Sequence, residues 1–384
     1  MTESEYKTRD LVFVMTGATG IPGGIATLNL NILRVLVQLA EARGMRFSVF
    51  SYLETEEDRP DFLPPDVKFR SFQGNKRALV AALLKASCSR PILVFDHVTL
   101  ALPVLPFAVA GMVKTIIFVH GSEASSRLRR TSRWSFHSAA LVLANSHFTL
   151  NKMRECVPRF NGVACPLGLS PRFKLKAAIP PPDRERLEFV AADGQVRALG
   201  DQVLLMVARM HPDEPRKGHY PLLKAWPAVA REFPQAQLVF AGQGENKSKL
   251  EQLAREGGAG ASIFLVGPVS VEQLERLYGH CYGFVMPSKQ EGFGLVYLEA
   301  MNFGKTCVGC FDDGAEDVIV HEQTGLLVRD PNDAEELQTV LRSLLTDPAR
   351  AQAMGRKGFA RLHENFTSRH VQERIKLHIG SVLS

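Results

Sequence analysis

The sequence lacks any hydrophobic run long enough to cross a membrane as a helix. The uncharged stretch 98–113 contains Pro103 and Pro106 and falls short of the about 20 apolar residues that a membrane span needs. We therefore expect a buried helix there. The chain begins Met-Thr-Glu-Ser-Glu-Tyr-Lys, which is too polar for a secretory signal. These absences predict a cytoplasmic protein.

Cysteine is scarce, with six in 384 residues, and without a secretory route these thiols should be reduced. Cys307 and Cys310 form a CxxC pair, but a structural zinc needs four ligands and no second pair stands at metal spacing. No DxD motif follows a strand, and Asp312-Asp313 is the nearest approach to one. We therefore expect no metal and no other cofactor, and we interpret the CxxC as part of a buried strand.

Charge of one sign is not in large excess. The net charge of +6 is too small over this length to indicate nucleic-acid binding, although it suits phosphate-bearing ligands or an anionic membrane surface. Hydrophobic residues make up 45% of the chain and charged residues 22%, as in soluble proteins with substantial cores. The length predicts two domains.

Apolar runs of strand length alternate with amphipathic segments of helix length. The expected strands are 11–15, 47–52, 92–95, 115–119 and 140–144 in the first half and 203–208, 237–241, 262–266, 283–286 and 306–309 in the second. Alternating strands and helices predict parallel sheets covered by helices on both faces. The fold class is therefore α/β, with two Rossmann-like, doubly wound parallel-sheet domains facing a cleft.

The alternation lapses between the two halves, around three consecutive prolines at 180–182. We accordingly predict an N-terminal domain over 1–175, a linker over 176–200 and a C-terminal domain over 201–366. The remaining residues, 367–384, are predicted to form a helix with no strand after it, and packing of this helix back on the N-terminal domain is left open.

A glycine-rich run, Thr16-Gly-Ala-Thr-Gly-Ile-Pro-Gly23, follows the first strand. It matches the TGxxGxxG fingerprint of short-chain dehydrogenases, and Tyr220 with Lys224 supplies a YxxxK, so an NAD(P) enzyme is one alternative. Against it, Glu54 lies beyond the usual spacing for a ribose-binding acid, and Tyr220 falls after the linker. We expect Gly23 and Gly24 instead to line a turn close to a sugar or phosphate.

Residues 286–301 carry the most informative pattern. A strand ends there, a loop with Gly292 and Gly294 follows, and a helix begins near Leu295. The amides of Phe293, Gly294 and Leu295 would therefore project from a helix N-terminus, where unpaired donors and the helix dipole favour an anion. The glycines would allow a phosphate to approach closely.

Two glutamates flank this loop. Glu299 lies one turn into the expected helix, on the same face as Leu295, where its carboxylate can accept hydrogen bonds from ribose hydroxyls. Glu291, in the loop, is placed to do the same for a hexose on the other side of the phosphates. The segment therefore predicts a site for a nucleotide sugar.

Glu291-Gly-Phe-Gly-Leu295…Glu299 resembles the EX7E motif of family 4 retaining glycosyltransferases, which have the GT-B fold. Most of the chain shares the pattern. The further matches are Gly23-Gly24, His120-Gly-Ser-Glu123, Asn145-Ser-His-Phe-Thr149, Val207-Ala-Arg209, Arg216-Lys217-Gly218, Ala241-Gly-Gln-Gly244 and Gly325-Leu-Leu-Val328. One departure stands out: the family often has GGxxE where this chain has Asp313-Gly-Ala-Glu-Asp317, so no ligand role is carried over there.

The resemblance implies roles for individual residues. Arg209 and Lys217 would neutralise the diphosphate, the amides around Gly294 would hold its distal phosphate, and Glu299 would bind the ribose. Glu291 would bind the transferred sugar, and His120 would lie beside the sugar ring. The N-terminal domain would be the acceptor side, and the C-terminal domain would bind the UDP- or GDP-sugar.

The resemblance also implies a reaction, namely transfer of a hexosyl group to an acceptor hydroxyl with retention of configuration and without a metal. The acceptor would be a glycan or a lipid-linked glycan in polysaccharide or glycoconjugate synthesis. A sugar-nucleotide epimerase of the same fold and a non-catalytic nucleotide-sugar binding protein are alternatives. The basic cluster Arg127, Arg129, Arg130 and Arg133 beside Trp134 is either a solvated face or a peripheral contact with the inner face of an anionic membrane.

Overall fold

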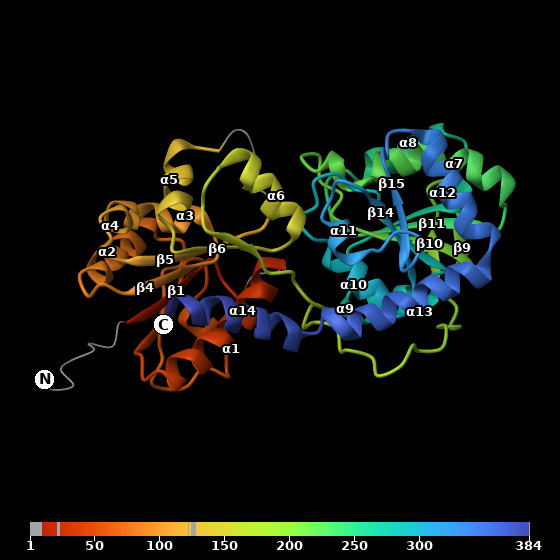
Figure 1. Ribbon diagram of the computed structural model, residues 1–384. Helices are drawn as coiled ribbons and strands as arrows, with labels where there is room; N and C mark the ends of the chain where they lie inside the picture. The colour runs from red at the N-terminus through yellow and green to blue at the C-terminus, as the bar shows by residue number, and fades with distance from the viewer. Residues whose placement is uncertain (1–9, 21–23, 122, 124–127, 384) are drawn as a thin grey trace, which may run out of the picture. The chain divides into compact units, whose positions relative to one another are not determined.

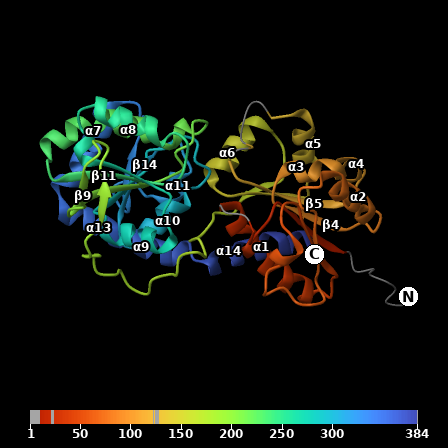
Figure 2. The same cartoon turned by 180° about the vertical axis from the view of Figure 1, so that it is seen from behind.

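A computed structural model describes residues 10–20, 24–121, 123 and 128–383 of the chain. Two compact units make up the fold, shown from opposite sides in Figure 1 and Figure 2. Unit 1 comprises Met1–Leu167 together with Ser368–Ser384, and unit 2 comprises Gly168–Thr367.

Unit 1 is built on a seven-stranded sheet whose neighbouring strands are all parallel. The strands are β1 (Leu11–Met15), β2 (Phe47–Ser51), β3 (Lys68–Ser71), β4 (Ile92–Phe95), β5 (Lys114–Val119), β6 (Leu141–Ala144) and β7 (Gly162–Ala164). They lie in the order β3-β2-β1-β4-β5-β6-β7. The chain therefore builds outward in one direction after β1 and in the other after β4, which makes the β1–β4 pair a topological switch point.

Helices cover both faces of this sheet, as both views show. They are α1 (Gly24–Ala42), α2 (Lys76–Ser87), α3 (Val98–Ala101), α4 (Leu105–Val109), α5 (Arg130–Ser138), α6 (His147–Cys156) and α14 (Ser368–Leu383). The last of these lies beside α1, where Gln372 Nε2 donates to Asn31 Oδ1 at 3.1 Å and Arg43 Nη2 donates to the Gly380 carbonyl at 3.2 Å. The helix expected over 367–384 is thus α14, and it belongs to unit 1.

Unit 2 contains a six-stranded parallel sheet in the order β12-β11-β10-β13-β14-β15. The strands are β10 (Gln202–Val207), β11 (Ala236–Ala241), β12 (Ile263–Gly267), β13 (Gly283–Val285), β14 (Thr306–Cys310) and β15 (Gly325–Val328). The switch point of this sheet is the β10–β13 pair. Both Cys307 and Cys310 lie buried in β14.

Helices again cover both faces, with α7 and α8 on one side and α9, α10 and α13 on the other (Figure 1 and Figure 2). Their bounds are α7 (His219–Glu232), α8 (Lys247–Glu256), α9 (Val271–His280), α10 (Leu295–Met301), α11 (Ala315–Val318), α12 (Ala334–Thr346) and α13 (Pro348–Asn365). A 3₁₀ turn, Pro215–Lys217, precedes α7. The interior strands β10, β11 and β14 are buried almost throughout, which explains their apolar sequences.

Several elements differ from the sequence-based expectations. Prolines 103 and 106 break the helix expected within 98–113 into α3, a 3₁₀ turn and α4. The expected linker 176–200 belongs to unit 2 and forms an antiparallel hairpin of β8 (Glu188–Val190) and β9 (Val196–Ala198). The edge strands β3 and β7 were not expected, because their partly exposed residues form no apolar run.

Among the described helices, only α1 has the length and mean hydropathy, 1.3, of a candidate membrane span. Its most apolar stretch is 56% buried inside the unit. Length and composition are weak evidence for a span here, since the core helix of an α/β domain has the same properties.

Candidate functional site

The predicted site residues follow the carboxyl ends of sheet strands in both units. In unit 2, Arg209 follows β10 and Glu291 follows β13, and these two strands pair directly. In unit 1, His120 follows β5 and Gly24 begins α1. Ligands of α/β sheets bind beyond the carboxyl ends of the strands, at a switch point. The carboxyl ends of β10 and β13 are therefore the better-defined place for the site.

Arg209 lies on the loop after β10, which backbone hydrogen bonds hold against the loop after β11. The Met210 amide donates to the Gln243 carbonyl at 2.9 Å, and the Asn246 amide donates to the Met210 carbonyl at 3.0 Å. The Arg209 guanidinium itself is exposed and donates to Glu214 Oε1 at 2.7 Å. An exposed pair of this kind is weak, so the guanidinium can exchange Glu214 for an anionic ligand at little cost.

Lys217 and Glu291 meet directly, although the sequence separates them widely. Lys217 Nζ lies 2.5 Å from Glu291 Oε2, and the two side chains are 25% and 19% exposed. A backbone bond from the Lys289 amide to the Arg216 carbonyl, at 2.9 Å, joins the same two loops. The structure therefore brings together a cation predicted to bind phosphate and a carboxylate predicted to bind sugar.

The glycine-bearing loop before α10 has the predicted geometry of a strand-to-helix turn. Gly294 has φ +85°, and a Cβ at this position would come within 2.4 Å of the Tyr297 ring, so only glycine fits. Phe293 is buried and its ring packs edge-on against Phe366, with centroids 5.9 Å apart. Gly292 is also buried and Leu295 is partly exposed. The Tyr297 amide donates to the Gly294 carbonyl at 3.1 Å, whereas the amides of Leu295 and Val296 have no acceptor within the helix.

Glu299 lies in the interior of unit 2 and is only 1% exposed. Arg172 Nη2 donates to both of its oxygens, at 2.8 and 3.0 Å, and the Tyr278 hydroxyl donates to Oε2 at 3.0 Å. Burial raises the pKa of Glu299, while Arg172 opposes that shift. Its predicted binding of ribose hydroxyls stays a prediction, and any such ligand would share the carboxylate with these two partners.

Arg172 and Tyr278 were not among the site residues predicted from the sequence. Arg172 fell within 1–175, the stretch assigned to the N-terminal domain, whereas the structure places it in unit 2. Tyr278 occupies a buried position on α9 and looks like an ordinary core aromatic in the sequence. No local motif connects either residue to Glu299, so only the tertiary fold identifies them.

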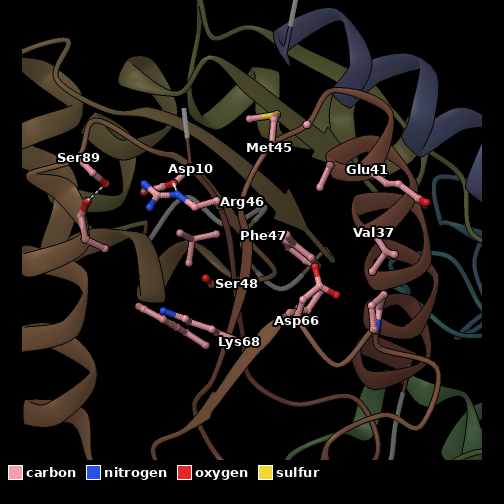
Figure 3. Close-up of a pocket in the computed structure, with 17 residues that line it drawn as sticks. Asp10, Val37, Glu41, Met45, Arg46, Phe47, Ser48, Asp66, Lys68 and Ser89 are labelled. Atoms are coloured by element: carbon pink, nitrogen blue, oxygen red, sulfur yellow. Dashed lines mark hydrogen bonds and ion pairs between the residues drawn. The ribbon is translucent and has the colours of Figure 1, made fainter. Parts of the chain in front are cut away.

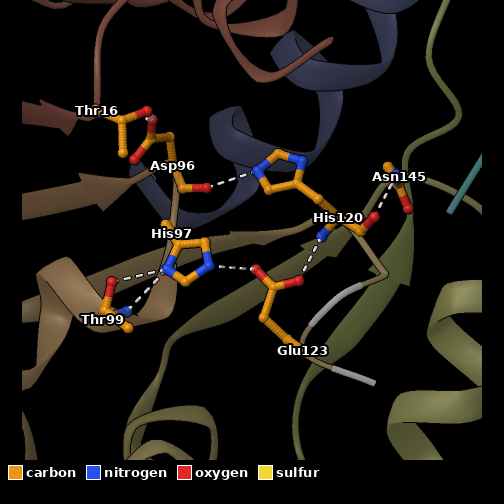
Figure 4. Close-up of polar contacts among 7 residues, drawn as sticks. All are labelled: Thr16, Asp96, His97, Thr99, His120, Glu123 and Asn145. Carbon is orange, nitrogen blue, oxygen red and sulfur yellow. Dashed lines mark hydrogen bonds and ion pairs between the residues drawn. The ribbon is translucent and has the colours of Figure 1, made fainter. Parts of the chain in front are cut away.

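His120 lies within a polar cluster in unit 1, drawn in Figure 4. Its Nε2 is 2.6 Å from the Asp96 carbonyl, and because a carbonyl only accepts, Nε2 carries the proton. In its neutral form, His120 therefore presents Nδ1 as an acceptor. Its backbone amide donates to Glu123 Oε2 at 3.0 Å, and Glu123 Oε1 lies 3.4 Å from His97 Nε2. Glu123 thus supports the loop that carries His120.

The glycine-rich turn of unit 1 is filled from within by Glu54. One oxygen of this carboxylate accepts from the amides of Ala18, Thr19 and Gly20, at 2.7, 2.6 and 2.9 Å. The other oxygen accepts from Ser51 Oγ at 2.6 Å, and Glu54 is only 2% exposed. The dehydrogenase fingerprint assigns these amides to a pyrophosphate. Because Glu54 already accepts from them, they are not available to a phosphate, which argues against the dehydrogenase interpretation.

The remaining residues of that interpretation add no support. Gly23 lies outside the described residues, and Gly24 is exposed at the start of α1. Tyr220, the tyrosine of the YxxxK, belongs to unit 2, and its hydroxyl accepts from Asn246 Nδ2 at 2.7 Å.

None of the predicted site residues lines the pocket of about 510 Å³ in unit 1 (Figure 3). Its lining includes Val12, Arg46, Phe47 and Lys68, at or near the amino ends of β1, β2 and β3. Ligands of parallel α/β sheets bind at the opposite, carboxyl edge. We therefore do not assign this pocket to the site. In the described part of the chain, no three His, Cys, Asp or Glu side chains are grouped as metal ligands.

The predicted basic cluster is partly described. Arg127 lies outside the described residues, Arg129 and Arg130 are exposed at the start of α5, and Arg133 is half-buried. Trp134 is 58% exposed on the same helix. The opposite side of α5 buries Ser132, Ser135 and Phe136. The helix therefore shows solvent a face that combines positive charge with a large aromatic side chain.

Comparison with known proteins bears mainly on unit 2. Residues 192–361 match the family described as Glycosyl transferases group 1. The matched segment contains Arg209, Lys217, Glu291 and Glu299. The GDP-mannose-dependent α-(1-6)-phosphatidylinositol monomannoside mannosyltransferase of Mycolicibacterium smegmatis is 28% identical over 262 residues. That match covers 65% of this chain and 65% of the relative, which is less than two thirds of the relative's length.

Solved structures extend the likeness to nearly the whole chain. Sucrose-phosphate synthase from Thermosynechococcus elongatus superposes with a TM-score of 0.70 and 21% identity, covering 97% of this chain and 98% of that one. Anabaena HepE in complex with UDP and glucose gives a TM-score of 0.73 and 16% identity, over 97% and 100%. At such identities the likeness shows the fold alone, and that fold is GT-B.

Proposed function

Taking residues 192–361 as a group 1 glycosyltransferase domain, we propose that the protein moves a hexosyl group from a nucleoside-diphosphate sugar to an acceptor hydroxyl, with retention of configuration. The observation that best supports this proposal is the contact between Lys217 and Glu291, beyond the carboxyl ends of β10 and β13 and inside the matched segment. A cation and a carboxylate held together at a switch point suit a ligand with phosphates on one side and hydroxyls on the other.

In this proposal Arg209 and Lys217 bind the diphosphate and stabilise the charge that grows on it as the bond to the sugar breaks. The loop 292–295 contributes backbone amides. Glu291 accepts hydrogen bonds from hydroxyls of the transferred sugar, and Glu299 serves the ribose. His120, through Nδ1, accepts from a further sugar hydroxyl.

The chemical step breaks the bond between the anomeric carbon and the diphosphate and forms a bond from that carbon to the acceptor oxygen on the same face. The acceptor proton passes to the departing phosphate oxygen, so no side chain is needed as nucleophile. Arg209 and Lys217 supply the positive charge that a divalent ion would otherwise provide, and the proposal therefore includes no metal.

The relatives suggest which donor to test first. The mycobacterial relative is named as GDP-mannose-dependent, whereas HepE was solved with UDP and glucose. We propose GDP-mannose as the first donor and a glycan or lipid-linked glycan as the acceptor class, in polysaccharide or glycoconjugate synthesis. The relative acts on a phosphatidylinositol mannoside, which is consistent with a lipid-linked acceptor.

A donor panel tests this function directly. GDP-mannose, UDP-glucose, UDP-GlcNAc and ADP-glucose would be incubated with the protein, with and without mannosylated lipid acceptors, and free nucleotide and products quantified. We expect acceptor-dependent release of one nucleoside diphosphate and an anomeric configuration equal to the donor's by NMR. Conversion of the donor to an epimer without transfer would instead identify a sugar-nucleotide epimerase. Activity abolished by EDTA and restored by Mg²⁺ would overturn the metal-free part.

The exposed face of α5 supports a peripheral site at the cytoplasmic face of an anionic membrane. Arg129 and Arg130 are exposed there, and Trp134 is suited to the interfacial region of a bilayer. Co-sedimentation with vesicles of phosphatidylcholine, with and without 30% anionic lipid as a rough composition, measures this contact. We expect binding only with anionic lipid, and a loss of binding in Arg129→Glu/Arg130→Glu. Equal binding by that variant would contradict the membrane site.

A further inference from the structure

Asp313 occupies the interior of unit 2, in the turn between β14 and α11. Its side chain is fully buried. Oδ2 accepts a hydrogen bond from the Glu291 amide at 2.7 Å, and Oδ1 accepts one from the Ala315 amide at 3.1 Å. The carboxylate thus joins the turn after β14 to the loop after β13, at the residue whose side chain contacts Lys217.

The main chains of these two segments are also interlocked. The Gly314 amide donates to the Glu291 carbonyl at 3.0 Å, so Glu291 is held at both its N–H and its C=O. A Cβ on Gly314 would lie 2.6 Å from backbone atoms of Glu291, Gly292 and Phe293, which leaves room for glycine only. The turn 313–315 is therefore packed as a support directly behind the loop 291–293.

We propose that Asp313 is a positioning residue for Glu291: its buried carboxylate fixes the main chain of the loop 291–293 so that the Glu291 side chain stays against Lys217. This inference rests on the proposed function for its effect on donor binding. It also accounts for the departure of Asp313-Gly-Ala-Glu-Asp317 from the GGxxE pattern, because the aspartate supplies a side-chain acceptor that a glycine lacks.

The support requires both oxygens to act as acceptors. Protonation turns one of them into a hydroxyl that faces a backbone N–H, so one of the two bonds is lost. Burial foremost, and then the charge of Glu291, raise the pKa of Asp313 to about 7, against the two backbone bonds and the charge of Lys217. The other titratable groups beside Asp313 are Tyr297 and Cys310, whose own pKa values are raised. The Glu291 loop should therefore loosen as the pH falls through about 7.

The functional test compares Asp313→Asn with Asp312→Asn. Asparagine keeps the shape of Asp313 but offers one acceptor in place of two, whereas Asp312 is exposed and donates its backbone amide to Glu316. We expect Asp313→Asn to lower kcat/KM for the donor about tenfold at pH 8, mainly through KM, and to remove the limb of the wild-type pH profile near 7. Asp312→Asn should stay within about twofold of wild type. An unchanged profile in Asp313→Asn would refute the positioning role.

A second measurement is independent of any enzymatic activity. Amide hydrogen exchange of peptides covering 289–294 reports the Glu291 N–H bond itself. We expect about tenfold faster exchange in Asp313→Asn than in Asp312→Asn, without nucleotide present. If Asp313→Asn does not fold, the same peptides in wild type should lose protection between pH 8.5 and 5.5, after correction for intrinsic rates. Protection that is constant with pH would refute the inference, while altered exchange in a protein without transferase activity would refute only the proposed function.

Discussion

Each unit has a glycine-bearing turn between a strand and a helix at or beside its switch point, and the two turns are used in opposite ways. In unit 1, the Glu54 carboxylate points inward and occupies the amides of residues 18–20. In unit 2, the Glu291 carboxylate points away from its own loop and contacts Lys217 at the β10–β13 edge. One turn has its own anion, whereas the other places a partly exposed cation and carboxylate beside the carboxyl ends of the strands.

The difference shows that glycines between a strand and a helix do not by themselves make a phosphate site. What decides is whether the protein satisfies the amides internally. An acid that lies three residues after the end of β2 can reach the first turn because β2 pairs with β1. In unit 2, the comparable buried acid, Asp313, accepts hydrogen bonds from the amides of Glu291 and Ala315 and lies behind the loop that carries Glu291.

Removing the cation from unit 2 should have the largest effect. We expect Lys217→Ala to reduce kcat/KM about 100- to 1000-fold, equivalent to about 3–4 kcal/mol, because the departing diphosphate would lose one of the two cations proposed to stabilise it. The matched control is Lys224→Ala, an exposed lysine on α7. Steady-state kinetics with the best donor measures both. Near-normal turnover of Lys217→Ala would mean that the unit 2 turn does not bind the anion.

Removing the Glu54 carboxylate from the unit 1 turn should mainly lower the stability of the protein. Glu54→Ala removes the acceptor of three backbone amides and should lower the free energy of unfolding by about 3 kcal/mol. Glu57→Ala, an exposed glutamate nearby, should leave it within about 0.5 kcal/mol. Denaturant unfolding gives both values.

Anion binding by the same two variants gives a second test of the difference between the turns. Inorganic sulfate should raise the melting temperature of Glu54→Ala, in which the amides are vacated, more than that of wild type or Glu57→Ala. Tight binding of NADH or NADPH to wild type, measured by fluorescence titration, would contradict the conclusion that Glu54 closes this turn.

The next effect comes from pH and belongs to His219, which is buried directly after the Lys217-Gly218 pair. Burial foremost, and then the charge of Lys217, lower the pKa of His219 to about 4. Between pH 6.5 and 4 the unfolded chain binds a proton that the folded protein excludes, so the stability present above pH 6.5 is lost as the pH falls. Integration from pH 8 to pH 5 gives a loss of about 2 kcal/mol.

His219→Phe isolates this contribution, because Asp313 has a raised pKa and changes stability with pH in the opposite direction. The difference in unfolding free energy between His219→Phe and wild type should shift by about 2 kcal/mol in favour of the variant between pH 8 and pH 5. Urea unfolding at the two pH values measures it. A difference that is independent of pH would mean that His219 takes up its proton normally within the folded unit.

The smallest effect is expected at Arg172, which is 47% exposed where it contacts the buried Glu299. Arg172→Met leaves that carboxylate with the Tyr278 hydroxyl as its remaining partner in the described structure. We expect a loss of about 1 kcal/mol in stability, since solvent screens the exposed arginine, and a higher KM for the donor with little change in kcat. Arg186→Met, which breaks the exposed pair with Glu188, should change neither. If the KM of Arg172→Met equals that of wild type, Glu299 does not take part in donor binding.

The local sequence pattern predicted most of the strands and helices, but it did not identify the residues that hold the site residues in place. The apolar runs 11–15 and 92–95 predicted β1 and β4 with the observed bounds, because interior strands of a parallel sheet are buried on both faces. The edge strands β3 and β7 were missed, because their residues are partly exposed and form no such run. The hairpin β8–β9 was taken for a linker because prolines and charges precede it.

The sequence alone determined the α/β class, the strand-to-helix turns and the identity of the cations and acids near them, since these depend on periodicity and on residues close together in the chain. Which carboxylate meets which partner was decided only by the tertiary structure. Glu54 reaches Ala18 across 36 positions, Asp313 reaches Glu291 across 22, and Arg172 reaches Glu299 across 127. Hydrogen bonds and ion pairs act over a few ångströms of space, and no spacing along the chain encodes contacts that depend on how strands are ordered in a sheet.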